Sequence, residues 1–373
     1  MGIPDVLKTT PFHFAYPADL ETEWIEVMEH GVPLWVTDPE AEYAAFRTRV
    51  GLLEYSMLYR WDLRGPGAVA TADAVFSRSV AGMRPGTMAY GVVVDEDGRM
   101  VDDPTAARYD DEHVLLVGGN PAVGELLEAH RAEGTTIEQV RERCCVLSVQ
   151  GPRSRELLQR LTATDLSNEA FPYYTFKTGV DIAGIPCQVN RIGFTAELGY
   201  EVVAPIERAE ELLGAVQQAG ADLGALVCGA AALMMCRIES GMVMAGLEYD
   251  ETSTPFECRL GWAVDLDKGS FLGREALLRS KDSAATRVVT LRVDGDPDGL
   301  DGQPIERDGA AVGVVTMAVP SPQLDGATLA MARIDRAAGD VGTELSVAAA
   351  DGPRTAKVVR TPVYDPERTR VRS

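Results

Sequence analysis

The spacing of apolar residues along the chain predicts short strands that alternate with a smaller number of helices. Apolar positions recur with a helical period in residues 20–31, 39–50, 67–78, 153–161, 207–219 and 274–280. They alternate with polar positions, or form short runs, in residues 56–65, 88–94, 100–106, 113–117, 145–150, 182–191 and 198–204. After a polar linker at 281–285, Val- and Thr-rich runs between Gly, Asp and Pro turns indicate a small β-barrel or sandwich. We therefore expect an α+β protein with a β-rich C-terminal domain.

Composition narrows the class of protein. A chain of 373 residues is longer than one hydrophobic core usually supports, so two or three domains are expected. The formal charge of −22 opposes contact with nucleic-acid phosphates, and we expect no nucleic-acid partner. The first 16 residues lack the features of a signal peptide, and no run approaches 18 apolar residues. These features predict a cytoplasmic protein with no membrane partner.

The cysteines and histidines give no sign of a metal or disulfide framework. The six cysteines form no Cys-x-x-Cys pair and lie in apolar surroundings, which is typical of buried reduced thiols. The four histidines show no His-x-x-x-His spacing. We expect no protein-bound catalytic metal.

The most informative short segment is Asp102-Asp103-Pro104, which lies in the second of two predicted strands joined by a polar turn. Adjacent carboxylates in a partly enclosed place raise one another's pKa, so such a pair suits a base, a hydrogen-bond anchor or a ligand. A solvated turn is the alternative, because Asp is common in turns. A second segment, Gly118-Gly119-Asn120-Pro121, is typical of a capped helix start, with phosphate binding at that helix end as the alternative.

Several separated stretches, read together, resemble one protein family. They are Val50-Gly51-Leu52 with Asp62-Leu63-Arg64-Gly65-Pro66, Tyr90 through Asp103, Val149-Gln150-Gly151-Pro152, Asn190-Arg191-Ile192-Gly193-Phe194-Thr195 with Gly199-Tyr200-Glu201, Arg237-Ile238-Glu239-Ser240-Gly241, and Tyr249-Asp250-Glu251 with Thr254-Pro255-Phe256-Glu257. Their order and spacing are similar to those of the folate-binding aminomethyltransferases. That family includes the glycine-cleavage T-protein, the dimethylglycine- and sarcosine-oxidising enzymes, and tetrahydrofolate-dependent demethylases.

The resemblance implies a three-domain cloverleaf around a central site for tetrahydrofolate. Its first two α+β domains are interleaved, as residues 1–54 with 136–225 and residues 55–135 with 226–280, and residues 281–373 form the third, barrel-like domain. It implies that Asp103 is the catalytic acid beside the folate nitrogens and that Glu201 hydrogen-bonds the pteridine ring. The remaining folate-binding positions are Tyr90, Phe194 and Arg237.

Elementary chemistry supports two of these roles. A pterin edge presents an amide N–H and an amino group, which one buried Glu201 carboxylate can accept in parallel hydrogen bonds. A strand-end surface acid is the alternative for Glu201. Transfer of a one-carbon unit to an amine places positive charge on nitrogen, and a nearby Asp103 carboxylate stabilises that charge or removes the proton.

Departures from the T-protein pattern bear on the substrate. Met57 stands where that pattern has His, Ala231-Ala232-Leu233-Met234 replaces a segment with Arg and Asp, and Val117 replaces an expected Asn. The substrate side of the pocket, assigned to Tyr55, Met57 and Met234, thereby becomes less polar. Several methionines could line a pocket for a methyl donor, with core packing as the alternative.

Three functional hypotheses follow. The preferred one is a tetrahydrofolate-dependent demethylase acting on a small O-, S- or N-methylated substrate, because the Asp-Asp-Pro segment resembles the demethylase branch. The second is a T-protein that forms methylenetetrahydrofolate and needs a carrier protein as partner. The third is a folate-binding iron–sulfur assembly factor, which Ser270 in Lys268-Gly269-Ser270-Phe271 disfavours because that group has Cys there.

Overall fold

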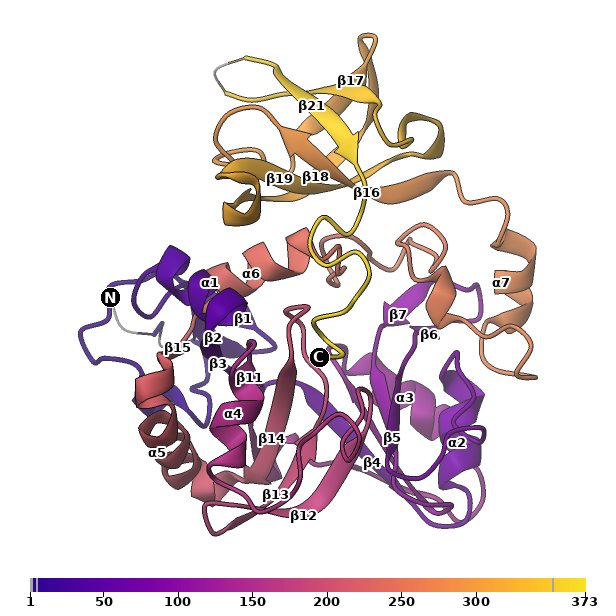
Figure 1. Cartoon of the computed structure of the whole chain (residues 1–373). Coiled ribbons are helices and arrows are strands. Elements are labelled where there is room, and N and C mark those ends of the chain that lie inside the picture. Colours follow the sequence, from indigo (N-terminus) through magenta and orange to yellow (C-terminus); the bar gives the residue numbers. More distant parts are fainter. Residues whose placement is uncertain (1–2, 5, 351) are drawn as a thin grey trace.

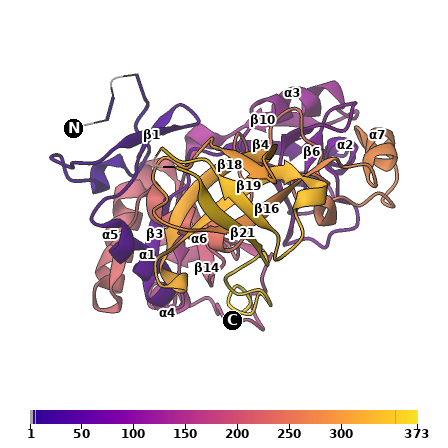
Figure 2. The same cartoon turned by 90° about the horizontal axis from the view of Figure 1, so that it is seen from above.

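The computed structural model describes residues 3–4, 6–350 and 352–373. Two β-sheets with their covering helices lie side by side, and a β-barrel lies across one end of them (Figure 1). Seen from that end, the barrel overlies both sheet bodies (Figure 2). None of the described helices is long and apolar enough to cross a membrane.

A five-stranded antiparallel sheet forms one body. Its strand order is β10 (Thr136–Gln139), β4 (Tyr59–Arg64), β9 (His113–Gly118), β8 (Thr105–Arg108) and β5 (Thr87–Tyr90). Helices α2 (Ala68–Val75) and α3 (Ala122–Ala129) cover one face, where Ala72 and Leu127 pack against Leu63 and Leu116. The opposite face of this sheet packs against the second body.

A six-stranded sheet forms the second body. Its order is β12 (Phe176–Ile182), β13 (Ile185–Asn190), β14 (Gly199–Pro205), β11 (Cys144–Gln150), β3 (Val50–Glu54) and β15 (Ala225–Val227), antiparallel except between β3 and β15. Helices α4 (Ser154–Gln159) and α5 (Ala209–Gly220) bury Leu157 and Leu213 against its outer face. Side chains that alternate away from those helices point toward the first body.

The third body is a closed barrel. Its strands follow the order β16 (Thr286–Val293), β19 (Ala327–Asp335), β18 (Ala310–Ser321), β17 (Pro304–Arg307), β20 (Glu344–Val347) and β21 (Arg354–Val359). Helix α7 (Arg274–Ser280) precedes it. Closure of the barrel pairs every edge strand, which is how a small all-β domain avoids an exposed edge.

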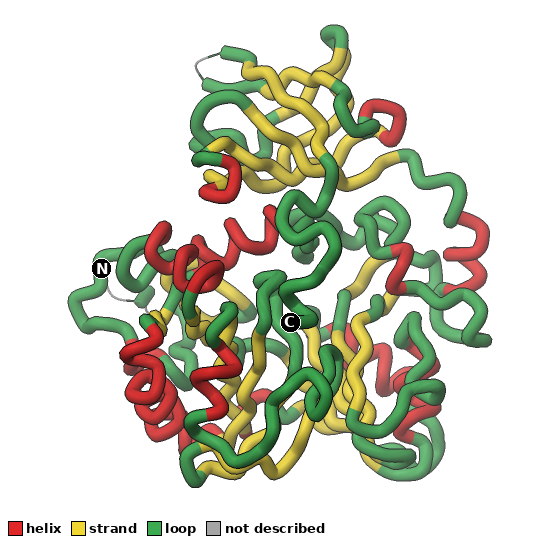
Figure 3. The backbone as a smooth tube through the Cα atoms, viewed as in Figure 1, coloured by secondary structure: helices red, strands yellow, loops and turns green. Residues whose placement is uncertain are grey.

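The largest apolar cluster lies where the three bodies meet. It joins helices α1 (Pro39–Thr48) and α6 (Ala230–Glu239) to the small hairpin of β6 (Val93–Val94) and β7 (Met100–Asp102). On the barrel side it includes Val288, Val319, Leu329 and Met331, which we call the barrel floor. After β21 the chain continues as a long loop that runs down from the barrel to the C-terminus, where the Ser373 carbonyl accepts from Arg155 and Arg191 of the six-stranded body (Figure 3). This junction positions the residues of the candidate site.

The expected α+β fold with a C-terminal barrel is confirmed. The helix predicted for residues 20–31 is wrong: β1 (Trp24–Val27) and β2 (His30–Pro33) form a hairpin there. Met28 and Glu29 have φ of 49° and 71°, the left-handed pair that closes a two-residue hairpin turn. Strand β12 was not predicted. The domain boundaries stay a prediction.

Candidate functional site

Asp103 lies where a hairpin leaves the five-stranded sheet. Strand β5 ends at Tyr90 and β8 begins at Thr105, and Pro104, which has no N–H to donate, separates β7, paired with β6, from β8, paired with β5 and β9. The Tyr90 hydroxyl donates to Oδ2 of Asp103 at 2.5 Å, and the Tyr249 hydroxyl donates to Oδ1. Burial raises the pKa of Asp103, and the hydrogen bonds from Tyr249 and Tyr90 partly oppose that rise.

Asp102 faces the other way and has a different set of partners. Its Oδ2 accepts from the backbone N–H of Gly119 at 2.9 Å and of Asn120 at 3.2 Å, next to the start of α3. A side chain at position 118 would collide with this carboxylate, so Gly118 permits its close approach. Burial, and then the neighbouring Asp103, raise the pKa of Asp102. The amides considered for phosphate binding are thus already bonded to Asp102, which favours the capped-turn interpretation.

The two tyrosines that bind Asp103 belong to the largest apolar cluster. Tyr55, Tyr90 and Phe194 pack partly exposed against the cluster that buries Met234 and Tyr249. The Tyr90 ring also stacks on the half-exposed Trp262, with ring centroids 5.5 Å apart. The structure therefore brings four of the predicted residues, Tyr55, Tyr90, Phe194 and Met234, into one cluster with the partners of Asp103.

Strand register places two rows of side chains on facing sheets. In the five-stranded sheet the paired positions are Tyr90, Thr105, Val117 and Arg60. In the six-stranded sheet they are Phe176, Asn190, Glu201, Ser148 and Leu53. Paired residues share a face, and Val117 and Phe176 belong to one cluster between the sheets. Glu201 therefore faces the sheet that carries Tyr90.

Glu201 lies in a nearly closed environment at 8% exposure. Asn190 donates to its Oε2 at 3.4 Å, a long hydrogen bond that leaves most of the carboxylate's acceptor capacity unused. Burial raises the pKa of Glu201, and the charge of Arg60 opposes that rise. Burial and then the Glu201 charge raise the pKa of Tyr55, so Tyr55 lies close to this carboxylate. Because Glu201 is buried, it is not the strand-end surface acid that was the alternative interpretation.

Two predicted residues lie in other surroundings. Met57 packs with Val32 and Ala230 beneath the N-terminal hairpin. Arg237 is fully buried, donates to Oε2 of Glu248 at 2.7 Å, and lies against barrel methionines. The roles predicted for these two residues stay predictions, since the described contacts are apolar packing for Met57 and a buried ion pair for Arg237.

Sequence reasoning missed three polar residues at this site. Tyr249 was quoted only as part of a family stretch, Asn190 likewise, and Arg60 was noted only within a predicted strand. The alternation of residues along β4 places Arg60 on the same face as Val117. This was a usable sign of a functional residue, because a cation on an inward face needs a partner. The partner lies on a strand far away in the sequence, so the signal could not be interpreted from spacing.

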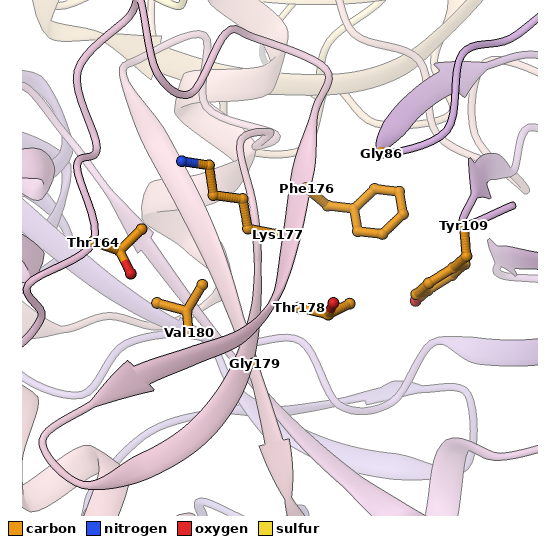
Figure 4. Close-up of a pocket in the computed structure, with 8 residues that line it drawn as sticks. All are labelled: Gly86, Tyr109, Thr164, Phe176, Lys177, Thr178, Gly179 and Val180. Atoms are coloured by element: carbon orange, nitrogen blue, oxygen red, sulfur yellow. The ribbon is translucent and has the colours of Figure 1, made fainter.

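A surface cavity of about 390 Å³ opens beside β12 and is lined by the eight residues in Figure 4. None of them is a predicted site residue. Tyr109, at its edge, donates to Gln188 at 2.5 Å, and Gln188 donates to Asn190 at 2.8 Å, beside Glu201. Within the described ranges, no three His, Cys, Asp or Glu side chains converge as a metal site would require.

Two facing sheets under a closed barrel are the architecture of the aminomethyltransferases. The structure of glycine-cleavage aminomethyltransferase T from Bartonella henselae superimposes with a TM-score of 0.86 over 96% of this chain and 98% of that chain, at 23% identity. The model of the GCVT N-terminal domain matches residues 13–268, and the glycine cleavage T-protein C-terminal barrel domain matches residues 287–365. The chain belongs to this family of folate-dependent one-carbon transferases.

Curated relatives extend the comparison. Trimethylamine-oxide aldolase of Ruegeria pomeroyi is 32% identical over 99% of this chain, which spans about half, 48%, of that protein. Aminomethyltransferases of Halothermothrix orenii and Caldanaerobacter subterraneus are 29% and 30% identical over 95% and 96% of this chain, and over 99% and 96% of their own lengths. The family is thus established, and the substrate is not fixed by these names.

Proposed function

We propose that the protein is a cytoplasmic, tetrahydrofolate-dependent demethylase that removes a methyl group from a small O-, S- or N-methylated substrate. The observation that carries the proposal is Asp103, a buried carboxylate with a raised pKa that accepts hydrogen bonds from Tyr90 and Tyr249, two members of the largest apolar cluster. Tetrahydrofolate bound between the sheets would supply the nucleophilic nitrogen.

The residues between the sheets fit a pterin. Glu201 is a buried carboxylate with free acceptor capacity, and the Nε of the buried Arg60 has no hydrogen-bond partner. A ring that offers both donors and acceptors would satisfy both groups. In this proposal Glu201 binds the pterin edge, and Tyr90 and Phe194 pack against the cofactor. Arg237 acts indirectly, by holding Glu248 at the barrel floor.

Asp103 takes the proton that the reaction releases. When the amine nitrogen forms its bond to the methyl carbon, the bond from that carbon to the leaving atom breaks and its electrons stay with the leaving group. The nitrogen is then cationic and loses its proton. A carboxylate with a raised pKa is a stronger base than an exposed Asp, so Asp103 is suited to accept it.

The surroundings of Asp103 favour a cationic methyl donor. The Asp103 carboxylate, held by the Tyr90 and Tyr249 hydroxyls, attracts a sulfonium or a quaternary ammonium, and such a group leaves as a neutral molecule. Tyr55 and Met234 supply the apolar wall for its methyl groups. A relative whose name refers to trimethylamine oxide supports a donor with several methyl groups on one heteroatom.

The test is incubation of the purified protein and tetrahydrofolate with a panel of sulfonium, quaternary ammonium, methylamine and methoxy-aromatic compounds. We expect 5-methyltetrahydrofolate by mass spectrometry with at least one onium compound. Absence of a methylated folate product across the whole panel would reject the demethylase proposal.

Full-length aminomethyltransferase relatives favour one alternative, the glycine-cleavage T-protein. Its partner would be an aminomethylated lipoyl carrier protein, and its folate product would carry a methylene group. Reconstitution with that carrier decides between the two, because a methylene and a methyl product differ in mass.

The role of Glu201 gives a separate prediction. In Glu201→Gln the side chain can no longer accept two hydrogen bonds as a charged group, so tetrahydrofolate should bind about 30- to 150-fold more weakly, the effect of losing roughly 2–3 kcal/mol. Isothermal titration calorimetry measures it. The matched control is Glu207→Gln, an exposed acid just beyond the same strand, which should bind as the wild type does.

A further inference from the structure

Arg60 is a buried cation without a protein partner. It is 2% exposed, its Nε has no hydrogen-bond partner, and no hydrogen bond or ion pair joins its guanidinium to any residue that the structure describes. The guanidinium of every other buried arginine donates to a described residue: Arg47 to Glu239, Arg141 to Glu29, Arg191 to the Gly199 carbonyl, and Arg237 to Glu248. Arg60 is the exception among them.

The location of Arg60 is fixed by register and by charge. It pairs with Val117 in the row that continues to Thr105 and Tyr90, on the face that looks toward the six-stranded sheet. Its charge acts on Glu201 and on Tyr109, which belong to the polar chain around Asn190. It is close enough to Glu201 to interact through charge, and the two are not within ion-pair distance.

A buried guanidinium without an acceptor is costly, because it has lost most of its hydration and no protein acceptor replaces that water. Arg60 therefore needs an acceptor that enters between the sheets beside Glu201. The required molecule presents acceptor and donor groups next to one another, since the guanidinium only donates and the carboxylate only accepts. The 4-oxo group, N3–H and 2-amino group of a pterin form such an edge, in that order.

We propose that Arg60 is a specificity-determining residue that donates a hydrogen bond to the 4-oxo oxygen of the pterin whose N3–H and 2-amino group are accepted by Glu201. This inference rests on the proposed use of tetrahydrofolate and adds a reason for selectivity. A ring with an amino group at position 4 places a donor against the guanidinium and leaves both without an acceptor.

The experiment measures binding of tetrahydrofolate and of its 4-amino analogue to the full-length protein by calorimetry. Glu201 alone already favours the 4-oxo ring, because the 4-amino ring lacks N3–H. The informative quantity is therefore the change, between wild type and variant, in the ratio of the affinities for tetrahydrofolate and the 4-amino analogue. In Arg60→Met, tetrahydrofolate should bind about 10- to 100-fold more weakly while the analogue changes by less than about 3-fold. The control Arg64→Met removes an exposed arginine from the same strand and should leave both affinities unchanged.

Thermal unfolding without ligand separates this role from a structural one. Arg60→Met should unfold at the same temperature as the wild type or higher, because it removes an unpaired buried charge. Arg60→Gln, which keeps a polar side chain, should also lose preference for the 4-oxo ring. Equal weakening of both ligands, no weakening, or failure of both variants to fold would overturn the proposal. A wild-type protein that binds no folate would instead reject the proposed function itself.

Discussion

Asp103→Asn should lower kcat about 10²- to 10⁴-fold, the usual contribution of a positioned general base, and change tetrahydrofolate affinity by less than about 3-fold. The amide keeps the size of the side chain and can accept from Tyr90 or Tyr249. It cannot accept the proton released at nitrogen. Steady-state kinetics with the donor found in the panel, together with calorimetry, measure both quantities.

The pH dependence checks the same role. The carboxylate form is the active form, so kcat/KM should fall as pH decreases through the pKa of Asp103, which lies above the ordinary value for Asp. Tyr249→Phe removes a hydrogen bond that stabilises the charged form, so the pKa rises further and the activity should be lost at a higher pH. A profile unchanged in Tyr249→Phe would argue against Asp103 as the titrating group.

The control for Asp103→Asn is Asp97→Asn in the exposed turn of the same hairpin. It makes the same chemical change a few residues away and should retain full activity. An Asp103→Asn variant as active as this control would remove Asp103 from the mechanism, whatever its effect on stability.

Glu248→Gln should destabilise the protein by about 3–5 kcal/mol, the range for breaking one side of a buried ion pair. Glu248 accepts from Arg237, from the Met244 backbone and from Thr316 on the barrel, and it therefore joins α6 to β18. The variant leaves the Arg237 guanidinium buried without a counterion. The midpoint of urea-induced unfolding measures the loss.

Two comparisons make this result specific. Glu156→Gln breaks exposed pairs with Arg153 and Arg160 and should cost less than about 1 kcal/mol. In Glu248→Gln combined with Arg237→Met the uncompensated charge is absent, so the double variant should be more stable than Glu248→Gln alone. A double variant with simply additive losses would show that the pair contributes through packing and not through charge.

Much of the site could be anticipated from short sequence segments because their geometry is local. Asp103 and Tyr90 lie on two ends of one hairpin, and the Asp-Asp-Pro segment interrupts a strand where Pro cannot donate. The apolar replacements were also recognisable, and Met234 does lie in the apolar cluster that includes Tyr90 and Tyr249. The position of Met57 could not be predicted, because it depends on the N-terminal hairpin, which was expected to be a helix.

The sequence by itself determined the α+β class, the barrel and the family, and it singled out Asp103 as the candidate acid, since periodicity, turn residues and ordered motifs are properties of neighbouring positions. Only the tertiary structure decided which carboxylate of the pair meets Tyr249, that Arg237 is bonded to Glu248, and that Arg60 faces Glu201 from another sheet. These pairings join strands and helices that are far apart in the chain. They are set by sheet register and by how two sheets pack, and spacing along one strand carries no information about either.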